Sequence, residues 1–88
     1  MLASSEVVVT LPTDVDLHAR PAAQFVRTAV GFAADIAICV DDREANAKSL
    51  LAVLALGARG WTALRLTASG DDAPLALDAL RDCVAAFD

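Results

Sequence analysis

Strand-like and helix-like patterns of hydrophobic and polar residues follow one another along this chain. Three segments either alternate apolar and polar residues or are rich in β-branched ones, which predicts strands over 6–11, 35–40 and 61–68. The Asp41-Asp42 pair marks a turn, after which residues 43–46 are expected to return as a short further strand. A stripe of apolar residues at spacings of three and four predicts a helix from His18 to Gly31. A similar stripe predicts a last helix that has Pro74 in its first turn and Leu77, Leu80, Val84 and Phe87 on its core face. Residue propensities predict one more helix over 48–56, which Gly57 ends.

The order of these elements is β-α-β-β-α-β-α, and no linker, repeat or low-complexity segment interrupts it. We therefore expect residues 1–88 to form a single domain of the α+β class. Amphipathic strands bury only one face of their sheet, because successive side chains point to opposite sides. Three helices on one face of a four-stranded sheet are the natural arrangement.

The predicted middle helix differs from the other two. Residues 49–56, SLLAVLAL, are apolar on every side, although a helix in a two-layer domain buries only one stripe. If that stripe faces the sheet, Leu50, Leu51 and Leu54 point elsewhere. Two hypotheses remain open: a neighbouring segment covers these leucines, or they form an exposed patch that docks partner proteins.

Charge and residue inventory exclude several classes of function. The formal net charge of −5 provides no basic surface for nucleic acid or anionic lipid. One histidine and two cysteines without CxxC spacing, Cys39 and Cys83, do not supply the usual ligands of a metal site. Neither a Walker loop nor a GxGxxG fingerprint is present. We therefore expect neither a metal ion nor another cofactor.

Cysteine usage and hydropathy also predict where the protein resides. Two scattered thiols in an otherwise ordinary domain are typical of a reduced, cytoplasmic protein. The N-terminal sequence MLASSEVVVT lacks the basic start of a signal peptide. The longest uncharged apolar stretch, Leu50–Ala58, is far shorter than the ~18–20 residues that span a bilayer. We expect a cytoplasmic protein that is not inserted into a membrane.

His18 is the strongest candidate for chemistry. It lies where a loop enters the first predicted helix, and Arg20 and Pro21 follow it. The first turn of a helix presents N–H groups without intrahelical partners and the positive end of the dipole, so it favours an anion. Imidazole is a nucleophile near neutral pH, and the guanidinium of Arg20 suits phosphate oxygens. A phosphoryl group attached to His18 is one hypothesis, and an ordinary solvent-facing histidine near a helix start is the alternative.

Three blocks of the sequence, in order, resemble the signatures of HPr, the family of histidine-containing phosphocarriers in the phosphoenolpyruvate-dependent sugar phosphotransferase system. Residues 17–23, LHARPAA, resemble the active-site signature of the family. Residues 47–51, AKSLL, with Leu56-Gly57 after them, resemble the segment of the regulatory serine. Residues 68–73, ASGDDA, resemble the third block. The spacing between the blocks also fits, so the resemblance covers essentially the whole chain.

This resemblance implies an open-faced β-sandwich, in which a four-stranded antiparallel sheet has three helices on one face. It also implies a stoichiometric phosphoryl carrier rather than an enzyme. His18 would take a phosphoryl group on Nδ1 from enzyme I and pass it to sugar-specific IIA domains. Arg20 would stabilise the transferred charge, Pro21 would help fix the helix start, and the carrier would act as a monomer.

The resemblance further implies regulation and partner contacts. Ser49 matches the position that a dedicated HPr kinase/phosphorylase modifies in many members of the family, which damps transfer and recruits a transcriptional regulator. A serine in front of a helix also serves as an N-cap, and one residue can have both roles. The positions that we expect to contact protein partners are Ala19, Ala23, Arg27, Lys48, Leu50, Leu51 and Leu54.

Two positions depart from the family pattern. Asp16 stands where the family usually has glycine, and a carboxylate beside a phosphate site is unfavourable because like charges repel. Trp61 stands where a glycine commonly precedes the fourth strand, with Gly60 displaced by one. Two alternatives therefore stay open: a regulatory HPr-like paralogue of a nitrogen-related or dihydroxyacetone-kinase branch, or a non-catalytic docking module. The retained His-x-Arg-Pro run argues against the docking module, which needs no nucleophile.

Overall fold

Four strands and three helices follow one another in the order that the sequence pattern predicts. The computed structural model describes residues 4–87, so the first three residues of the N-terminal segment considered for a signal peptide lie outside it. The strands are β1 (Ser4–Thr10), β2 (Asp35–Val40), β3 (Arg43–Asn46) and β4 (Ala63–Ser69). The helices are α1 (Ala19–Val30), α2 (Leu50–Ala55) and α3 (Ala73–Ala85).

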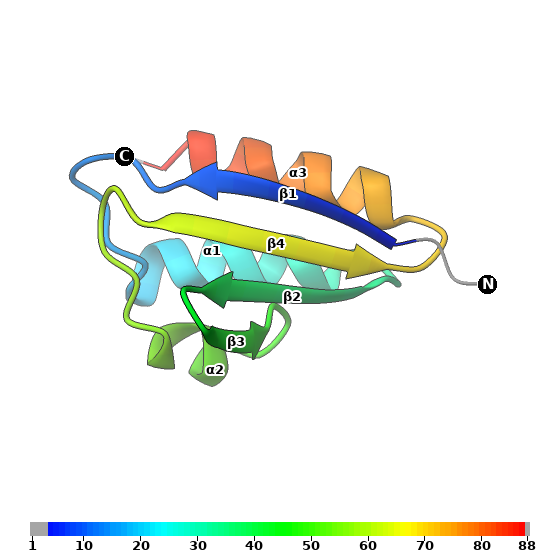
Figure 1. Ribbon diagram of the computed structural model, residues 1–88, viewed down its shortest axis with the longest axis horizontal. Helices are drawn as coiled ribbons and strands as arrows, with labels where there is room; N and C mark the ends of the chain where they lie inside the picture. Colours follow the sequence, from blue (N-terminus) through cyan, green and yellow to red (C-terminus); the bar gives the residue numbers. More distant parts are fainter. Residues whose placement is uncertain (1–3, 88) are drawn as a thin grey trace.

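The strands form one antiparallel sheet in the order β1-β4-β2-β3. Figure 1 shows α1 and α3 behind this sheet and the shorter α2 beside β3, while the other face carries none of the helices of residues 4–87. This arrangement is the predicted open-faced sandwich. The register places Val7 opposite Leu66 and Val9 opposite Leu64, so the side chains of neighbouring strands form continuous rows.

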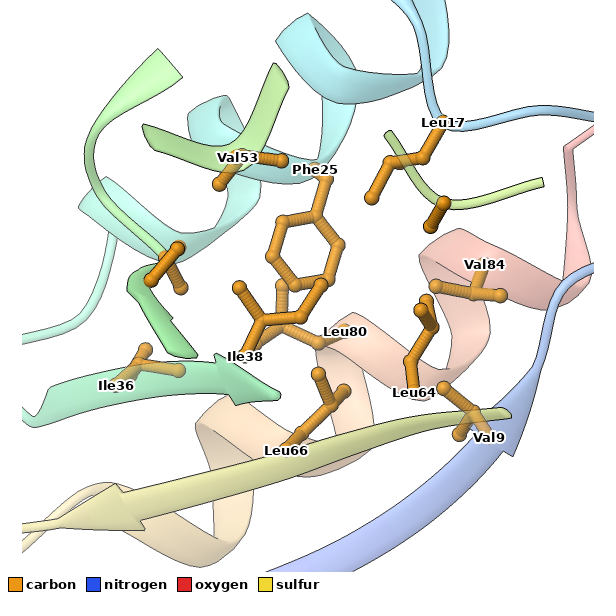
Figure 2. Packing of buried hydrophobic residues seen from close by; sticks show 14 of the residues in the cluster. Val9, Leu17, Phe25, Ile36, Ile38, Val53, Leu64, Leu66, Leu80 and Val84 are labelled. Carbon is orange, nitrogen blue, oxygen red and sulfur yellow. The ribbon is translucent and has the colours of Figure 1, made fainter. Parts of the chain in front are cut away.

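The hydrophobic core lies between this sheet and the helices. Phe25 of α1 is fully buried and lies among side chains of the sheet, of α3 and of α2 (Figure 2). Full burial of one such side chain contributes about 1.5–3 kcal/mol to the free energy of unfolding. Other members of the cluster come from all seven elements and include Val9, Leu17, Ile38, Val53, Leu64, Leu66, Leu80 and Val84. The core therefore anchors the loop that precedes α1 as well as the regular elements.

Several predicted element boundaries differ from those of the structure, and two of the differences have a clear structural description. The fourth strand begins at Ala63 and not at Trp61, because Trp61 has a φ of 70° and its side chain is 71% exposed. A positive φ interrupts the extended backbone that a strand needs. The last helix ends at Ala85, two residues before Phe87. Phe87 is nevertheless buried, so its place in the core stripe is confirmed although it is not helical.

Helix α2 is shorter than predicted, and its leucines differ in how far neighbouring segments cover them. Ser49 precedes the helix and Gly57, at a φ of 61°, follows it as the predicted stop. Leu51 is 82% exposed and Leu50 is 40% exposed, whereas Leu54 is half-buried and packs against the core. Leu50 and Leu51 are therefore exposed and neighbouring segments partly cover Leu54, while the docking of partners on these leucines stays a prediction.

Within residues 4–87, none of the helices has the length and apolar character that a membrane-spanning helix requires. Over the same residues, no group of three or more His, Cys, Asp and Glu side chains is placed to hold a metal ion.

Candidate functional site

His18 lies at the junction between the β1–α1 loop and helix α1. It is the N-cap residue, with an extended backbone at φ −107° and ψ −158°, and its side chain is exposed and makes no capping hydrogen bond. Its backbone is fixed on both sides: its N–H donates to the Asp16 carbonyl at 2.9 Å, and its carbonyl accepts from Ala22 N–H at 2.8 Å. The backbone of His18 is thus held at a defined place, and the residue is exposed on the surface.

The first turn of α1 supplies the surroundings that an anion on His18 would need. Ala19 and Arg20 are exposed there, and N–H groups of a first helical turn have no intrahelical acceptor. Pro21 is buried in the same turn, where its fixed φ suits a helix and its missing N–H costs nothing. The α1 dipole adds a partial positive charge at this end of a 12-residue helix. The sequence pattern correctly predicted that these residues lie at the helix start.

A hollow of about 270 Å³ opens beside His18. Residues 16–18, Leu54 of α2 and residues 57–59 line it, so the α2–β4 loop forms its second wall. The loop before His18 and the loop after α2 are joined by a hydrogen bond from Leu17 N–H to the Ala58 carbonyl at 2.8 Å. The histidine therefore lies at the edge of a concave surface built from two segments about 40 residues apart.

Asp16 has a structural partner that the sequence did not reveal. Its carboxylate Oδ1 accepts a hydrogen bond from Gly60 N–H at 2.8 Å. Gly60 in turn lies so close to the preceding loop that a Cβ at this position would be 2.1 Å from the Thr13 carbonyl oxygen. The carboxylate at the family's usual glycine position thus binds the two loops together, which gives it a role besides repulsion of phosphate.

The predicted partner contacts on α1 lie along one side of the helix. Ala19, Ala23 and Arg27 are spaced by four residues, which places them one above another. Arg27 is exposed in the last turn, where a cation also interacts favourably with the helix dipole. Seven residues of helix, or about 10 Å, separate it from Arg20. The structure therefore places Arg27 on the same helix as His18 but not beside it.

The predicted residues in and before α2 divide into half-buried and exposed ones. The Ser49 hydroxyl accepts a hydrogen bond from Ala52 N–H at 3.3 Å, which confirms its role as the N-cap. Lys48 is half-buried, and its ammonium group donates to the Phe32 carbonyl at 2.7 Å, so this cation is engaged within the fold. Leu50 and Leu51 remain exposed. Leu54 lines the hollow beside His18 and connects this apolar patch to the histidine.

One charged residue of the hollow, Arg59, was not among the predicted site residues. It is exposed in the α2–β4 loop and lines the same hollow as His18 and Asp16. In the sequence it is only an arginine after a helix, 41 positions from His18. No local pattern signals it, because its place depends on how the two loops meet.

Comparisons with known proteins agree with this arrangement. The family model described as the PTS HPr component phosphorylation site matches residues 4–86. The phosphocarrier protein HPr of Haloferax volcanii is 47% identical over 79 residues, which cover 88% of this chain and 89% of that protein. The multiphosphoryl transfer protein of Salmonella typhimurium is 41% identical over 86 residues, which cover 94% of this chain and 22% of that protein.

Similarity extends to a solved structure. The phosphocarrier protein HPr of Bacillus anthracis matches with a TM-score of 0.88 and 38% sequence identity, over 93% of this chain and 98% of that one. The residues matched by the family model include all four strands, all three helices and His18. The fold, the placement of the histidine and the sequence thus agree, and the chain belongs to the HPr family of phosphocarrier proteins of the phosphotransferase system.

Proposed function

We propose that this chain carries phosphoryl groups on His18, from the phosphohistidine of enzyme I to a histidine of sugar-specific IIA domains. The observation that supports this most strongly is the exposed imidazole at the start of the 12-residue helix α1, with Arg20 in the first turn. A carrier needs an accessible nucleophile and a positive environment for the charge that it receives. His18 supplies the first, and Arg20 with the helix start supplies the second.

The transfer step balances without an added reactant. The lone pair of His18 Nδ1 attacks the phosphorus atom, and the P–N bond of the donor breaks with its electron pair returning to the donor nitrogen. The proton on the other ring nitrogen of each imidazole stays in place during this exchange. Arg20 and the first-turn N–H groups of α1 stabilise the negative phosphoryl oxygens. The reverse sequence at the next acceptor restores His18, so the chain is a stoichiometric carrier and not an enzyme.

Partners dock, in this proposal, on the surface that adjoins His18. The α1 side contributes Ala19, Ala23 and Arg27, and α2 contributes the apolar patch of Leu50, Leu51 and Leu54. Large exposed apolar side chains next to a reactive group are typical of interaction sites. We assign enzyme I and the IIA domains to this same surface, because both must bring a histidine to His18. The carrier acts as a monomer in the cytoplasm, where thiols such as the free Cys39 and Cys83 stay reduced.

Phosphorylation of Ser49 by an HPr kinase/phosphorylase is the regulatory part of the proposal. Ser49 is half-buried at the N-cap, directly before the exposed Leu50. A phosphate there would remain electrostatically compatible with the helix start but would add about two negative charges to the edge of the apolar patch. Docking of enzyme I would weaken as a result, while a transcriptional regulator with a basic surface would gain a contact.

Intact-mass measurement tests the carrier function directly. The chain is incubated with phosphoenolpyruvate and enzyme I and weighed before and after acid treatment. We expect one added phosphoryl group that acid removes, because phosphohistidine is acid-labile and phosphoserine is not. His18→Ala should abolish the acid-labile group while leaving the circular dichroism spectrum unchanged, and Ser49→Ala should retain it. Arg20→Ala should slow acceptance about tenfold, the effect of losing one charge-assisted contact. Undiminished labelling of His18→Ala would rule out the assignment.

A further inference from the structure

Two residues of opposite charge line the hollow beside His18. Asp16 comes from the loop before α1, and Arg59 comes from the loop after α2. Both side chains are exposed, and both line the same hollow of about 270 Å³ as His18. A phosphoryl group on His18 would therefore lie near one carboxylate and one guanidinium besides Arg20.

The loop that carries Arg59 is held firmly against the loop that carries His18. The neighbours of Arg59 on both sides are hydrogen-bonded across: the Ala58 carbonyl accepts from Leu17 N–H, and Gly60 N–H donates to Asp16 Oδ1, both at 2.8 Å. Arg59 itself donates its backbone N–H to the Thr62 hydroxyl at 3.2 Å. The backbone position of Arg59 relative to His18 is therefore fixed by contacts to the very segment that presents the histidine.

The segment before His18 and the segment after Arg59 are also joined by backbone hydrogen bonds farther from the hollow. Leu11 N–H donates to the Thr62 carbonyl at 3.0 Å, and Trp61 N–H donates to the Leu11 carbonyl at 3.2 Å. Gly60 fits against the Thr13 carbonyl only because it lacks a Cβ. These hydrogen bonds hold the loop in place, so the backbone of residue 59 keeps a fixed position beside the hollow, within reach of which its side chain extends.

Charge balance indicates what Arg59 does there. A carboxylate in the hollow opposes the addition of a phosphoryl dianion to His18 by direct repulsion. A guanidinium in the same hollow offsets that repulsion and offers several N–H donors to phosphate oxygens. Asp16 would thus be tolerated beside a phosphoryl site because the contact that it makes, to Gly60, also holds the compensating cation in place.

We propose that Arg59 is a second phosphoryl-binding residue of this carrier, with Asp16 as the residue that positions it through Gly60. This inference rests on the proposed function of His18 as the phosphoryl acceptor. Arg59 donates hydrogen bonds to the phosphoryl oxygens and keeps its proton throughout, so no bond beyond the N–P bonds of donor and His18 forms or breaks. Asp16 contacts neither the phosphorus nor the histidine nucleophile: it positions Arg59 through the loop, and its charge repels the phosphoryl group from a distance.

The test uses potassium phosphoramidate, a small phosphoryl donor that requires no protein partner. The full chain is phosphorylated on His18, and the rate is followed by intact mass and by ³¹P NMR. We expect Arg59→Ala to slow phosphorylation about tenfold and Arg59→Lys to recover part of that loss, because lysine keeps the charge but not the fork of donors. The matched control is Arg81→Ala, which removes an exposed arginine of α3 that pairs with Asp78, and it should change the rate less than about twofold.

Two further measurements distinguish direct contact of Arg59 with the phosphoryl group from a purely structural role of Arg59 and Asp16. In the phosphorylated wild type, the Nε–H resonance of Arg59 should shift and exchange with water more slowly, whereas that of Arg81 should not. Asp16→Ala should slow phosphorylation when Arg59 is present but accelerate it in the Arg59→Ala background, where only the repulsion of Asp16 remains. A purely structural role of Asp16 would give the same sign in both backgrounds.

The outcomes distinguish this inference from the proposed function. If His18 accepts phosphoramidate but not the phosphoryl group of enzyme I, the carrier function fails while the Arg59 measurements still decide the inference. The inference itself is overturned if Arg59→Ala is as fast as Arg81→Ala, if the Arg59 resonance does not respond to phosphorylation, or if the effect of Asp16→Ala keeps its sign. Failure of wild-type His18 to react with phosphoramidate would also overturn it.

Discussion

At the two ends of the sheet, a single aspartate carboxylate joins segments that are far apart in the sequence. Asp16, at the His18 end, accepts one hydrogen bond, from Gly60 N–H. Asp72, at the opposite end, accepts two, from Ala33 N–H and Ala34 N–H, both at 2.8 Å, and uses both of its oxygens. The N–H of Ala33 is the main reason that the pKa of Asp72 is lowered from its ordinary value.

Each end of the sheet also has a hollow, and the two hollows are similar in volume but differ in the charges of their lining residues. The hollow at the His18 end has a volume of about 270 Å³, and its lining combines the histidine with one acidic residue, Asp16, and one basic residue, Arg59. A second hollow of about 250 Å³ lies on the open face of the sheet toward the Asp72 end, and its charged lining residues are Asp35 and Glu44. Volume alone would not tell the two apart. A phosphoryl anion is repelled by the acidic hollow and suits the one that combines a nucleophile with a cation.

The two ends of the sheet therefore differ in role: the contacts at the Asp72 end are structural, whereas those at the His18 end also shape the candidate site. The carboxylate of Asp72 is bound through both oxygens by backbone donors and fastens the α1–β2 loop to the start of α3. The contact of Asp16 fastens two loops, and it also places a carboxylate in the lining of the hollow beside His18. Substitutions at the Asp72 end should therefore change stability, whereas substitutions at the His18 end should change stability, transfer or docking depending on the group removed.

Substitution of Gly60 by alanine should have the largest effect on stability. The added Cβ would lie 2.1 Å from the Thr13 carbonyl oxygen, so the two loops must separate. We expect the free energy of unfolding to fall by about 1–3 kcal/mol, the usual range for forced overpacking. Urea denaturation followed by circular dichroism measures this loss. Gly31→Ala is the control, because its Cβ would meet the Thr28 carbonyl at 3.3 Å, and a small shift relieves that contact. Equal losses in both variants would contradict the close junction beside His18.

Substitution of an exposed leucine by glutamate should distinguish the docking surfaces at the two ends. Leu51 on α2 is 82% exposed near His18, and Leu75 in the first turn of α3 is 67% exposed at the Asp72 end. We expect Leu51→Glu to weaken enzyme I binding about tenfold, as loss of a central interface residue does, and Leu75→Glu to leave it unchanged. Both should alter the free energy of unfolding by less than about 0.5 kcal/mol, because neither side chain is buried. Calorimetric titration with enzyme I measures the affinity of each variant. A larger loss of affinity in Leu75→Glu than in Leu51→Glu would place the docking surface at the Asp72 end instead.

Acid should reveal the contribution of Asp72. Its folded pKa lies below its ordinary value of 3.8, because the Ala33 N–H stabilises the charged form. The stabilising contribution is therefore complete above about pH 4 and is lost as the pH falls through the lower pKa of the folded state. Asp72→Asn should reduce stability at neutral pH, since an amide group presents a donor to one of the two N–H groups, and should flatten the acid side of the stability profile. Asp71→Asn is the control, because Asp71 is the exposed neighbour of Asp72. An equal change in its profile of stability against pH would show that the loss of net charge alone is responsible.

The smallest expected effect is a gain in stability at Trp61. A φ of 70° costs a residue with a Cβ about 1–2 kcal/mol, while glycine costs about 0.5–1 kcal/mol through the entropy of the unfolded chain. Trp61→Gly should therefore stabilise the protein by about 0.5 kcal/mol, because the exposed ring contributes little packing. Trp61→Ala retains the Cβ and should show no such gain. Thermal unfolding of the three proteins checks the order, and a loss in Trp61→Gly would mean that the indole ring is held by contacts on the surface.

Several features of the fold follow from local sequence patterns. Alternation in β2 and β4 identified the inward side chains Ile36, Ile38, Leu64 and Leu66, because the side-chain period of a strand is two residues. Gly57 was correctly identified as a helix stop from its position after an apolar run. The boundary at Trp61 was wrong, since the apolar side chain continued the strand pattern while the backbone turned away.

The candidate site was only partly predictable. His18, Arg20, Pro21 and Ser49 lie within short segments, so local patterns were sufficient to place them at helix starts, while their functional roles stay predictions. The position of Lys48 against the Phe32 carbonyl was not predicted, since 16 residues separate the two groups. The role of Lys48 as a partner contact remains a prediction that competes with this internal bond.

The sequence by itself determined which segments are strands and helices, and it placed His18 and Arg20 at one helix start. Such features depend on residues only a few positions apart, so the spacing of side chains along the chain is sufficient to specify them. Only the tertiary structure decided that Asp16 binds Gly60, 44 positions away, and that Arg59 shares a hollow with His18. These contacts form because the core packs β1 against β4 and α1 beside α2, which brings the two connecting loops together at one end of the sheet.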